Sequence, residues 1–413
     1  MKRVLLIILI ALLLVVTTSS VVSAETITPR ATITDAEIDS FVQELCQLNA
    51  AGNKADIVNF IEGKFREALG EDEDISSGDS NVEKDLFGAN EESFLNIVAR
   101  INKDTSTKQI VIGAHYDVVK GEGAADNAVG VAALYATMKL LAGSISQLPY
   151  NITFVAFDGE EYGLLGSSYY VSSLSADELH NTLVMFNIDS IALGDHLYLM
   201  CENKHTTLAN TILANSSDIV EKPYAKGTFG TYLDMMYGYG YGYYESIQGS
   251  DHTPFRLSGV PIALLFSGTY DKGWGYRESS DNSQVINTAS DTYKNLINSG
   301  VDFVGRVHTV AGAISSTILS ADFTQVAENA QRELVNLNFW YNGWWVSLVI
   351  LVILVILAVF TWLYYRKLQK KAILGTAEIK DTTVFDKPDA DEIFSFDNNK
   401  KDTDIDDIFT FRK

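Results

Sequence analysis

The sequence predicts an α/β protein, a three-layer sandwich with a mixed, largely parallel central sheet flanked by helices, followed by one C-terminal transmembrane helix. Short apolar runs rich in Val, Ile and Phe recur along the middle of the chain, as in strands covered on both faces. Amphipathic helical patterns alternate with these runs, which favours parallel strands joined by helices. One charge-free apolar run near the C-terminus is long enough to cross a bilayer.

The composition limits the classes of protein to consider. The 413 residues carry a net charge of −22, which argues against a nucleic-acid-binding protein because such proteins present a basic surface. A hydrophobic fraction of 47% is too high for a disordered chain. The two cysteines, Cys46 and Cys201, exclude a disulfide-built scaffold. They could form one disulfide or remain two buried thiols, and we favour the thiols.

The predicted elements of the middle segment follow from their periodicity. Apolar residues recur at helical spacing in the first two elements, and residues 71–92 are acidic and polar, which predicts a solvated loop. The apolar runs that follow predict strands, and the patterns between them predict helices. The expected helices are 35–50, 54–69, 128–141, 208–215, 290–320 and 322–336, and the expected strands are 94–101, 109–114, 152–157, 183–188 and 260–266.

Two apolar runs near the ends of the chain predict its compartment. Lys2 and Arg3 precede an apolar stretch that leads to Ala24, which is typical of a cleaved signal peptide over residues 1–24, with an uncleaved anchor as the alternative. Residues 344–365 cover about 30 Å as a helix, one bilayer core. Basic residues follow at once, so the positive-inside rule places the C-terminus in the cytoplasm. We therefore expect a single-pass type I protein of the cell membrane.

The same boundaries divide the chain into domains. An extracellular domain is expected over residues 25–320, a juxtamembrane helical segment over 321–343, and a disordered cytoplasmic tail over 366–413. The tail carries two similar segments, DEIFSF at 391–396 and DDIFTF at 406–411. Presented twice, they could bind a cytoplasmic partner by bivalency, or they could be solvated low-complexity sequence.

Residues typical of metal ligands follow several predicted strands directly. His115 and Asp117 come after the run 109–114, the run 152–157 leads to Glu160 and Glu161, and Asp189 follows 183–188; Asp126 opens the helix 128–141. In open α/β sheets, ligands bind beyond the carboxyl ends of the strands. Converging carboxylates need a cation to neutralise them, and imidazole with carboxylate suits zinc. The pattern predicts a shared metal site.

A family resemblance rests on five segments that occur in order: GAHYDV, GAADNAVGVAAL, FVAFDGEEYGLLGS, FNIDSIA and GSDHTPF. The chain resembles the co-catalytic zinc exopeptidases, a family that includes aminopeptidase Y, bacterial leucyl aminopeptidases, glutamate carboxypeptidase and glutaminyl cyclase, with the non-enzymatic transferrin receptor as a relative. The resemblance covers about residues 90–310, and it implies a peptidase with one or two zinc ions.

The resemblance also implies roles for individual residues. One zinc would be bound by His115 and Asp189, the second by Glu161, and Asp126 would bridge both. Glu160 would be the general base for a metal-activated water, and Asp117 would orient His115.

The match departs from the family at its fifth ligand, a His in a Tyr-His-x-x-x-Asp-Thr segment. We align this segment with Tyr276 and Arg277, where a guanidinium cannot bind zinc. Three interpretations follow. The site could hold one zinc firmly, with Glu278 or His252 supplementing the second position. Arg277 could replace the positive charge of the second zinc and bind a carboxylate or carbonyl of the substrate, which would change the specificity. Tyr276 and His252 are further candidates to bind substrate or support the site. Catalysis could also be lost.

These observations predict a membrane-anchored zinc exopeptidase, most simply an aminopeptidase acting on peptides outside the cell. A catalytically inactive receptor or scaffold on the same fold is the alternative from a different class. A glutaminyl-cyclase-like acyl transfer is less favoured, because the single-zinc cyclases keep the final His of the family pattern.

Overall fold

The computed structural model describes residues 32–70, 80–89, 92–101, 106–144, 148–202, 206–221, 249–268, 285–341 and 344–379. The chain divides into two compact units, Met1–Gly343 and Trp344–Lys413. The predicted signal peptide, the tail motifs, Tyr276 and Arg277 lie outside the described residues.

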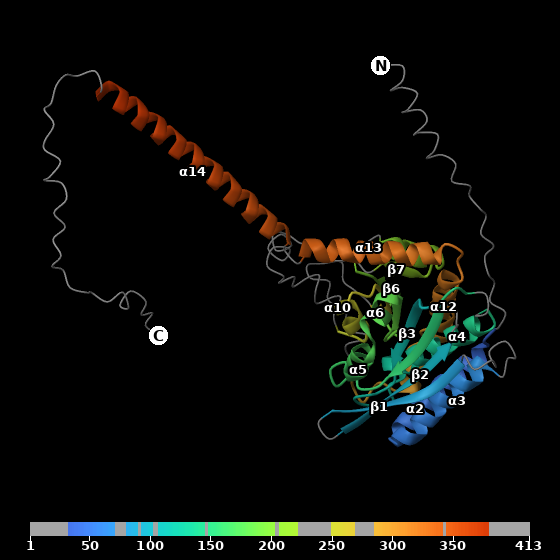
Figure 1. The fold of residues 1–413 in the computed structure, drawn as a ribbon. Coiled ribbons are helices and arrows are strands. Elements are labelled where there is room, and N and C mark those ends of the chain that lie inside the picture. Colours follow the sequence, from blue (N-terminus) through green and yellow to red (C-terminus); the bar gives the residue numbers. More distant parts are fainter. Residues whose placement is uncertain are drawn as a thin grey trace, which may run out of the picture. The chain divides into compact units, whose positions relative to one another are not determined.

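The first unit is built on a mixed sheet of eight described strands in the order β1-β2-β4-β3-β5-β8-β6-β7 (Figure 1). The neighbours β4, β3, β5 and β8 run parallel to one another, whereas β1, β2 and β6 make antiparallel pairs. The predicted fold class is therefore confirmed. The strands are β1 Ser80–Ala89, β2 Glu92–Ile101, β3 Gln109–His115, β4 Asn151–Phe157, β5 Thr182–Ile188, β6 His196–Met200, β7 Ile219–Glu221 and β8 Ile262–Gly268.

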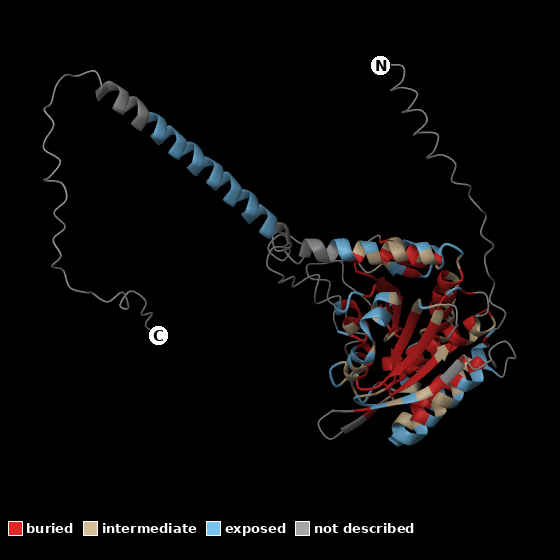
Figure 2. Ribbon diagram, viewed as in Figure 1, coloured by how far each residue is buried: buried red, intermediate tan, exposed pale blue. Residues whose placement is uncertain are grey.

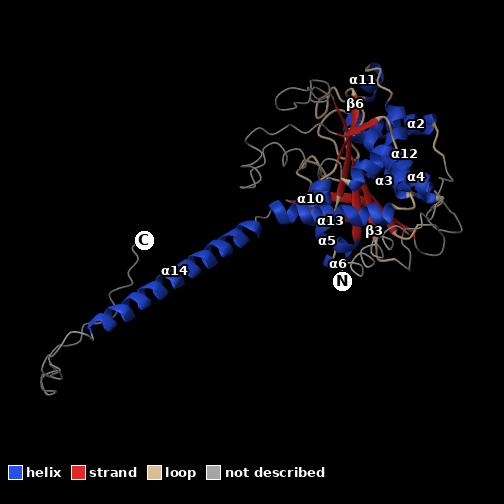
Figure 3. Cartoon of the chain, turned by 90° about the horizontal axis from the view of Figure 1, so that it is seen from above, coloured by secondary structure: helices blue, strands red, loops and turns tan. Residues whose placement is uncertain are grey.

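Helices cover both faces of this sheet, as Figure 3 shows from above. The larger layer packs on the main core and the smaller layer packs on a second core across the sheet. The larger layer contains α2 Asp35–Ala51, α3 Lys54–Leu69, α4 Val129–Ala142, α7 Thr207–Ala214, α11 Tyr293–Asn298, α12 Phe303–Ile318 and α13 Phe323–Tyr341; the smaller contains α5 Leu165–Ser173, α6 Ala176–Asn181 and α10 His252–Leu257.

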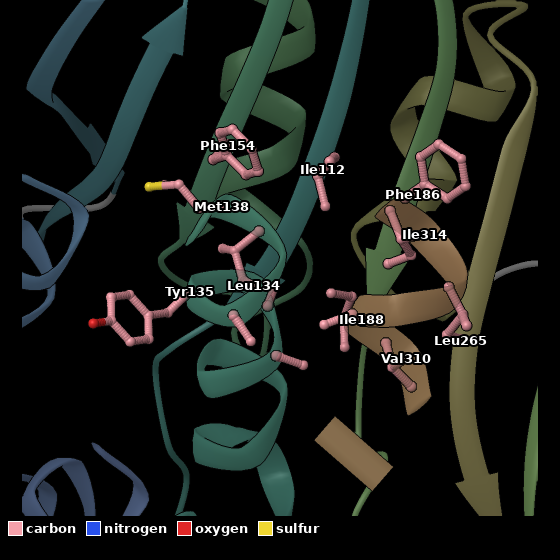
Figure 4. Packing of buried hydrophobic residues seen from close by; sticks show 14 of the residues in the cluster. Ile112, Leu134, Tyr135, Met138, Phe154, Phe186, Ile188, Leu265, Val310 and Ile314 are labelled. Atoms are coloured by element: carbon pink, nitrogen blue, oxygen red, sulfur yellow. The ribbon is translucent and has the colours of Figure 1, made fainter. Parts of the chain in front are cut away.

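The side chains of the central strands alternate between the two cores. In β3, Ile110 and Ile112 belong to the main core and Val111 to the second, because successive strand residues point to opposite faces. In β4, Phe154 and Phe157 divide in the same way. Figure 4 shows the main core, where α4 and α12 pack on the sheet. Burial on both faces explains why these strands read as continuous apolar runs (Figure 2).

The first two helices owe their limits to local signals. Thr34 and Glu37 form a capping box that satisfies free N–H groups at the start of α2. Gly52 ends α2 in a left-handed conformation, with φ 71°, and Asn53 then caps α3 by accepting from the Ala55 N–H. The two helices therefore turn sharply and bury Phe41 and Phe65 in the same core.

Several predictions about elements need correction. Residues 80–89, predicted as loop, form β1, because pairing with β2 lets Val82 and Phe87 become buried. The strands β6 and β7 were not predicted. The expected helix 290–320 is two helices, α11 and α12, separated at residues 299–302. The other predicted strands and helices are present with shifted ends, and Cys46 and Cys201 are free, buried thiols as favoured.

The second unit contains the helix α14, Trp344–Ile379. Within it, the segment Val346–Lys371 contains an 18-residue stretch with a mean hydropathy of 3.1 and is long and apolar enough to cross a membrane. The helix extends beyond the predicted boundary at residue 365, so part of the expected tail is helical.

An ion pair between the partly exposed Lys54 and the buried Asp158 joins α3 to the loop that carries the predicted catalytic carboxylates. Asp158, 2% exposed, pairs with Lys54 and accepts a hydrogen bond of 2.7 Å from the Leu95 N–H. Burial raises the pKa of Asp158, and Lys54 opposes that rise. The Lys54 ammonium also lies 5.0 Å from the centre of the Phe94 ring.

We expect Lys54→Met to lower the free energy of unfolding by about 1–3 kcal/mol at pH 7, because the Asp158 carboxylate loses its cation. The loss of Lys54 raises the folded-state pKa of Asp158 further, so the deficit fades at acid pH, where the carboxyl is protonated, and grows as pH rises. Urea unfolding of both proteins at several pH values between 4 and 8 measures how this loss depends on pH. Lys64→Met, which breaks an exposed pair with Glu67, is the control and should change little; equal losses would contradict the assignment.

Candidate metal centre

Three predicted ligands meet at the carboxyl edge of the sheet. The Nε2 of His115 lies 3.1 Å from Oδ1 of Asp126 and 3.4 Å from Oδ1 of Asp189. One ligand atom from each of the three side chains lies within 4.8 Å of the others, and His115 and Asp126 are buried. These distances are compatible with one cation bound by all three residues.

The order of the strands explains this meeting. His115 ends β3 and Asp189 directly follows β5, and β3 and β5 are parallel neighbours, so their carboxyl ends lie together. The Asp189 N–H donates to the Leu265 carbonyl of β8 at 3.0 Å, which continues the sheet into the site.

Asp126 is delivered by a tight turn, η1 Ala124–Ala128, that opens α4. Asp291 accepts hydrogen bonds from the Ala125 N–H at 2.7 Å and the Asp126 N–H at 3.0 Å. Asn127 holds the other side of the turn: its Nδ2 donates to the Ile188 carbonyl at 2.9 Å, and its Oδ1 accepts from the Ser190 N–H at 3.1 Å. The turn is therefore fixed against the end of β5.

A serine connects the two metal-facing carboxylates. The Oγ of Ser190 lies 3.1 Å from Oδ1 of Asp126 and 2.9 Å from Oδ1 of Asp189, so its single hydrogen can serve either group. Ser190 adopts a φ of 51°, a left-handed conformation that is uncommon for serine.

The two glutamates follow β4 in a loop that Asp117 organises. The Asp117 carboxylate accepts from the Glu160 N–H and the Glu161 N–H, both at 3.1 Å. The Nδ1 of His115 lies 3.3 Å from the Asp117 carbonyl oxygen and 3.6 Å from its carboxylate Oδ1. Asp117 therefore contacts the imidazole and also fixes the glutamate loop.

The site concentrates acidic groups away from water. Burial raises the pKa of Glu160 to about 9, with Asp189, Asp251 and Asp126 adding to the rise and His115 opposing it. Burial likewise raises the pKa of Glu161 to about 7. Burial opposes ionisation of Asp189 too, but the hydrogen bond and charge of His115, together with hydrogen bonds from Ser250 and Ser190, outweigh it and lower the pKa of Asp189 to about 2.

These residues fit a zinc ion. Imidazole and carboxylate oxygens are ligands that zinc accepts, and three protein ligands with a fourth position left for water are typical of catalytic zinc sites. The crowding of buried carboxylates around His115 would be costly without a cation. The donor set and its electrostatics therefore support the predicted cofactor.

The remaining predicted site residues divide into two groups. His252 is buried on α10, where its Nδ1 lies 3.3 Å from Nδ2 of Asn187, and it is not part of the three-residue ligand group found among the described residues. Tyr276 and Arg277 lie outside the described residues, so their expected roles stay predictions.

Sequence reasoning gave no role to several residues that organise the centre: Asn127, Ser190, Asn287 and Asp291. The Asn287 side chain faces Glu161, and with its nitrogen toward the carboxylate it donates to Oε1 at 2.5 Å and to Oε2 at 3.1 Å. The pair Asp291-Thr292 was the available signal, since the family pattern ends in Asp-Thr.

Comparison with known proteins identifies a family. Residues 96–310, just over half of the chain, match the model of peptidase family M28. The chain belongs to peptidase family M28. Among curated relatives, it is 32% identical over 179 residues to the probable lipoprotein aminopeptidase LpqL of Mycobacterium tuberculosis, covering 42% of this chain and 34% of that protein. It is 28% identical over 205 residues to aminopeptidase YwaD of Bacillus subtilis, covering 49% and 40%.

The chain thus spans well under half the length of these two M28 relatives. Among solved structures, the LapA aminopeptidase of Legionella pneumophila is 18% identical, with a TM-score of 0.49 over 70% of this chain and 72% of that one. The zinc aminopeptidase BSAP of Bacillus subtilis is 21% identical, with a TM-score of 0.41 over 55% and 50%.

We expect Asp291→Ala to lower the free energy of unfolding by about 2–4 kcal/mol, because the buried N–H groups of Ala125 and Asp126 lose their acceptor. Zinc affinity should fall by about 10–100-fold, since Asp126 is no longer held in place. Urea unfolding and chelator competition measure the two effects. Asp302→Ala, which removes the exposed cap of α12, is the control and should leave zinc affinity unchanged. Unchanged zinc affinity in Asp291→Ala would contradict this role.

Proposed function

We propose that this M28 protein is a zinc-dependent aminopeptidase that hydrolyses the N-terminal residues of peptides. The observation that carries this proposal is the group of His115, Asp126 and Asp189. Asp117, which contacts His115, accepts a hydrogen bond from the backbone N–H of Glu160, the proposed general base. Membership of a peptidase family supports hydrolysis of peptide bonds. Several curated relatives that match are named aminopeptidases, which supports cleavage at the N-terminus.

The chemistry follows from the properties of these side chains. Zinc, when bound, lowers the pKa of a coordinated water and polarises the substrate carbonyl. Glu160 takes the proton of the attacking water as its oxygen bonds to the carbonyl carbon. When the carbon–nitrogen bond breaks, Glu160 returns that proton to the leaving amine. Burial makes this carboxylate a strong proton acceptor, because it raises its pKa.

The negative charge of the site favours substrates with a free α-ammonium group. Glu160 and Glu161 lie in one partly exposed loop, and Asp251 is buried nearby on the chain segment that precedes α10. A cleft lined by one sign of charge concentrates ligands of the opposite sign. The amino terminus of a peptide carries such a charge, whereas its carboxyl terminus would be repelled.

We expect Glu160→Gln to lower kcat by at least about 10²-fold while zinc remains bound, because an amide cannot accept the water proton. The full-length chain, purified in detergent and loaded with zinc, is assayed with amino-acid amides and N-acetylated amides, and its zinc is measured. Glu44→Gln, an exposed substitution on α2, is the control. Wild-type protein that binds zinc but cleaves no N-terminal residue would favour the receptor or scaffold alternative.

We further propose that α14 anchors the protein as a single-pass type I membrane protein, with the peptidase unit outside the cell. The apolar segment Val346–Lys371 supports an anchor, and its last turns carry Arg366, Lys367, Lys370 and Lys371, which favours a cytoplasmic C-terminus. The DEIFSF and DDIFTF segments of the tail would then be available to a cytoplasmic partner.

Protease treatment of intact cells tests this topology. We expect external protease to remove an epitope tag placed after residue 24 and to spare one placed after Lys413, with permeabilised cells as the control. The reverse pattern, or a tagged protein that stays in the soluble fraction, would contradict the anchor.

Tail binding is tested by capture with the tail peptide, which should be lost when Phe394 and Phe409 are both changed to Ala.

A further inference from the structure

The side-chain amide of Asn287 occupies the space in front of the Glu161 carboxylate. With the amide assigned so that its nitrogen faces the carboxylate, Nδ2 lies 2.5 Å from Oε1 and 3.1 Å from Oε2, so one amide group contacts both oxygens. Glu161 is half-buried and Asn287 is exposed, which places the pair at the solvent side of the centre. Glu161 therefore already has a partner that is not a metal ion.

The sequence around Asn287 shows why this position matters. In the pattern Tyr-His-x-x-x-Asp-Thr, the histidine stands four residues before the aspartate. Asp291 and Thr292 provide that Asp-Thr pair, and Asp291 has a structural role at the centre because it holds the Asp126 turn. Counting back four residues places Asn287, rather than Arg277, at the histidine position.

The backbone supports the same placement. Asn287 adopts a φ of 60°, in the left-handed region where Asn, Asp and His are enriched among residues with a side chain. A histidine at residue 287 is therefore compatible with this backbone. Its imidazole would extend from the same backbone position from which the Asn287 amide now reaches Glu161.

The two side chains differ in what they offer to Glu161. A neutral imidazole presents a nitrogen lone pair that binds zinc, whereas the Asn287 amide, with its nitrogen toward the carboxylate, presents only N–H donors there. Without an imidazole, the ligands left for a second ion among the described residues would be Glu161 and Asp126. Asp126 would also bind the first ion. Two carboxylates are a poor zinc site when three or four protein ligands are usual.

We propose that the centre binds a single divalent ion, at His115, Asp126 and Asp189, and that Asn287 is a positioning residue that holds Glu161 where a second ion would otherwise bind. This inference rests on the proposed zinc-dependent function and specifies its cofactor. It attributes the loss of the second ion to Asn287, which stands at the position of the family's histidine ligand.

The test counts metal ions and does not depend on activity. Full-length protein in detergent is stripped with chelator, incubated with excess zinc, freed of unbound metal by gel filtration, and measured by atomic absorption. We expect one zinc per chain in the wild type and two in Asn287→His. Asn287→Ala, which removes the amide without adding a ligand, and Arg277→His should both stay at one.

A double variant identifies where the added ion binds. Asn287→His combined with Glu161→Ala should return to one zinc, because the new imidazole then lacks its carboxylate partner. If Asn287→His does not fold, Asn287→Asp supplies a carboxylate ligand at the same residue and should also gain a second zinc.

Two zinc ions in the wild type, or a gain in Arg277→His but not in either Asn287 variant, would overturn the inference. These outcomes are separate from a failure of the proposed function. One zinc per chain without hydrolysis would contradict the proposed peptidase function and support the single-ion centre. Two zincs per chain with hydrolysis would support the peptidase function and contradict the single-ion centre.

Discussion

Parallel pairing of β4, β3 and β5 delivers His115, Asp189 and the two glutamates to one edge of the sheet, and the rest of the centre depends on this arrangement. Acidic groups brought together in this way repel one another and lose their hydration. The raised pKa values of Glu160 and Glu161 are the direct sign of that cost. A bound cation relieves it, so the same crowding that strains the protein creates the affinity for a metal.

The loops at this edge are held by carboxylates that accept backbone N–H groups. Asp117 does this for the glutamate loop and Asp291 does it for the Asp126 turn. Because the accepting residues lie in other segments of the chain, each ligand loop is fixed by tertiary contacts. Asp158 extends the same principle outward, linking the loop after β4 to β2 and α3. The position of the proposed catalytic carboxylates is thereby coupled to packing some distance from the candidate metal centre.

The proposed single-ion centre gives Glu161 a different role from its neighbour. Glu160 remains free to move a proton, while Glu161 is held by an amide that carries no charge. A neutral partner leaves the site more negative than a second dication would. That difference strengthens attraction for a substrate ammonium group and weakens polarisation of the carbonyl, so substrate binding and chemistry are shifted in opposite directions.

Local sequence patterns are enough to predict the central strands and the residues that follow them. Strands buried on both faces leave continuous apolar runs, and His115, Glu160, Glu161 and Asp189 stand directly after such runs. Local patterns also predict the apolar segment of α14, since length and lack of charge are properties of a single stretch of chain.

The edges of the sheet and the contacts that hold the site in place depend instead on segments that are distant in the sequence. The strand β1 is half polar and forms because β2 is available to pair with it, which no local pattern reports. Asn287 and Asp291 lie 126 and 165 residues along the chain from the Glu161 and Asp126 groups that they contact. Asn and Asp are common in loops for local reasons, so their roles depend on a fold that brings distant segments together.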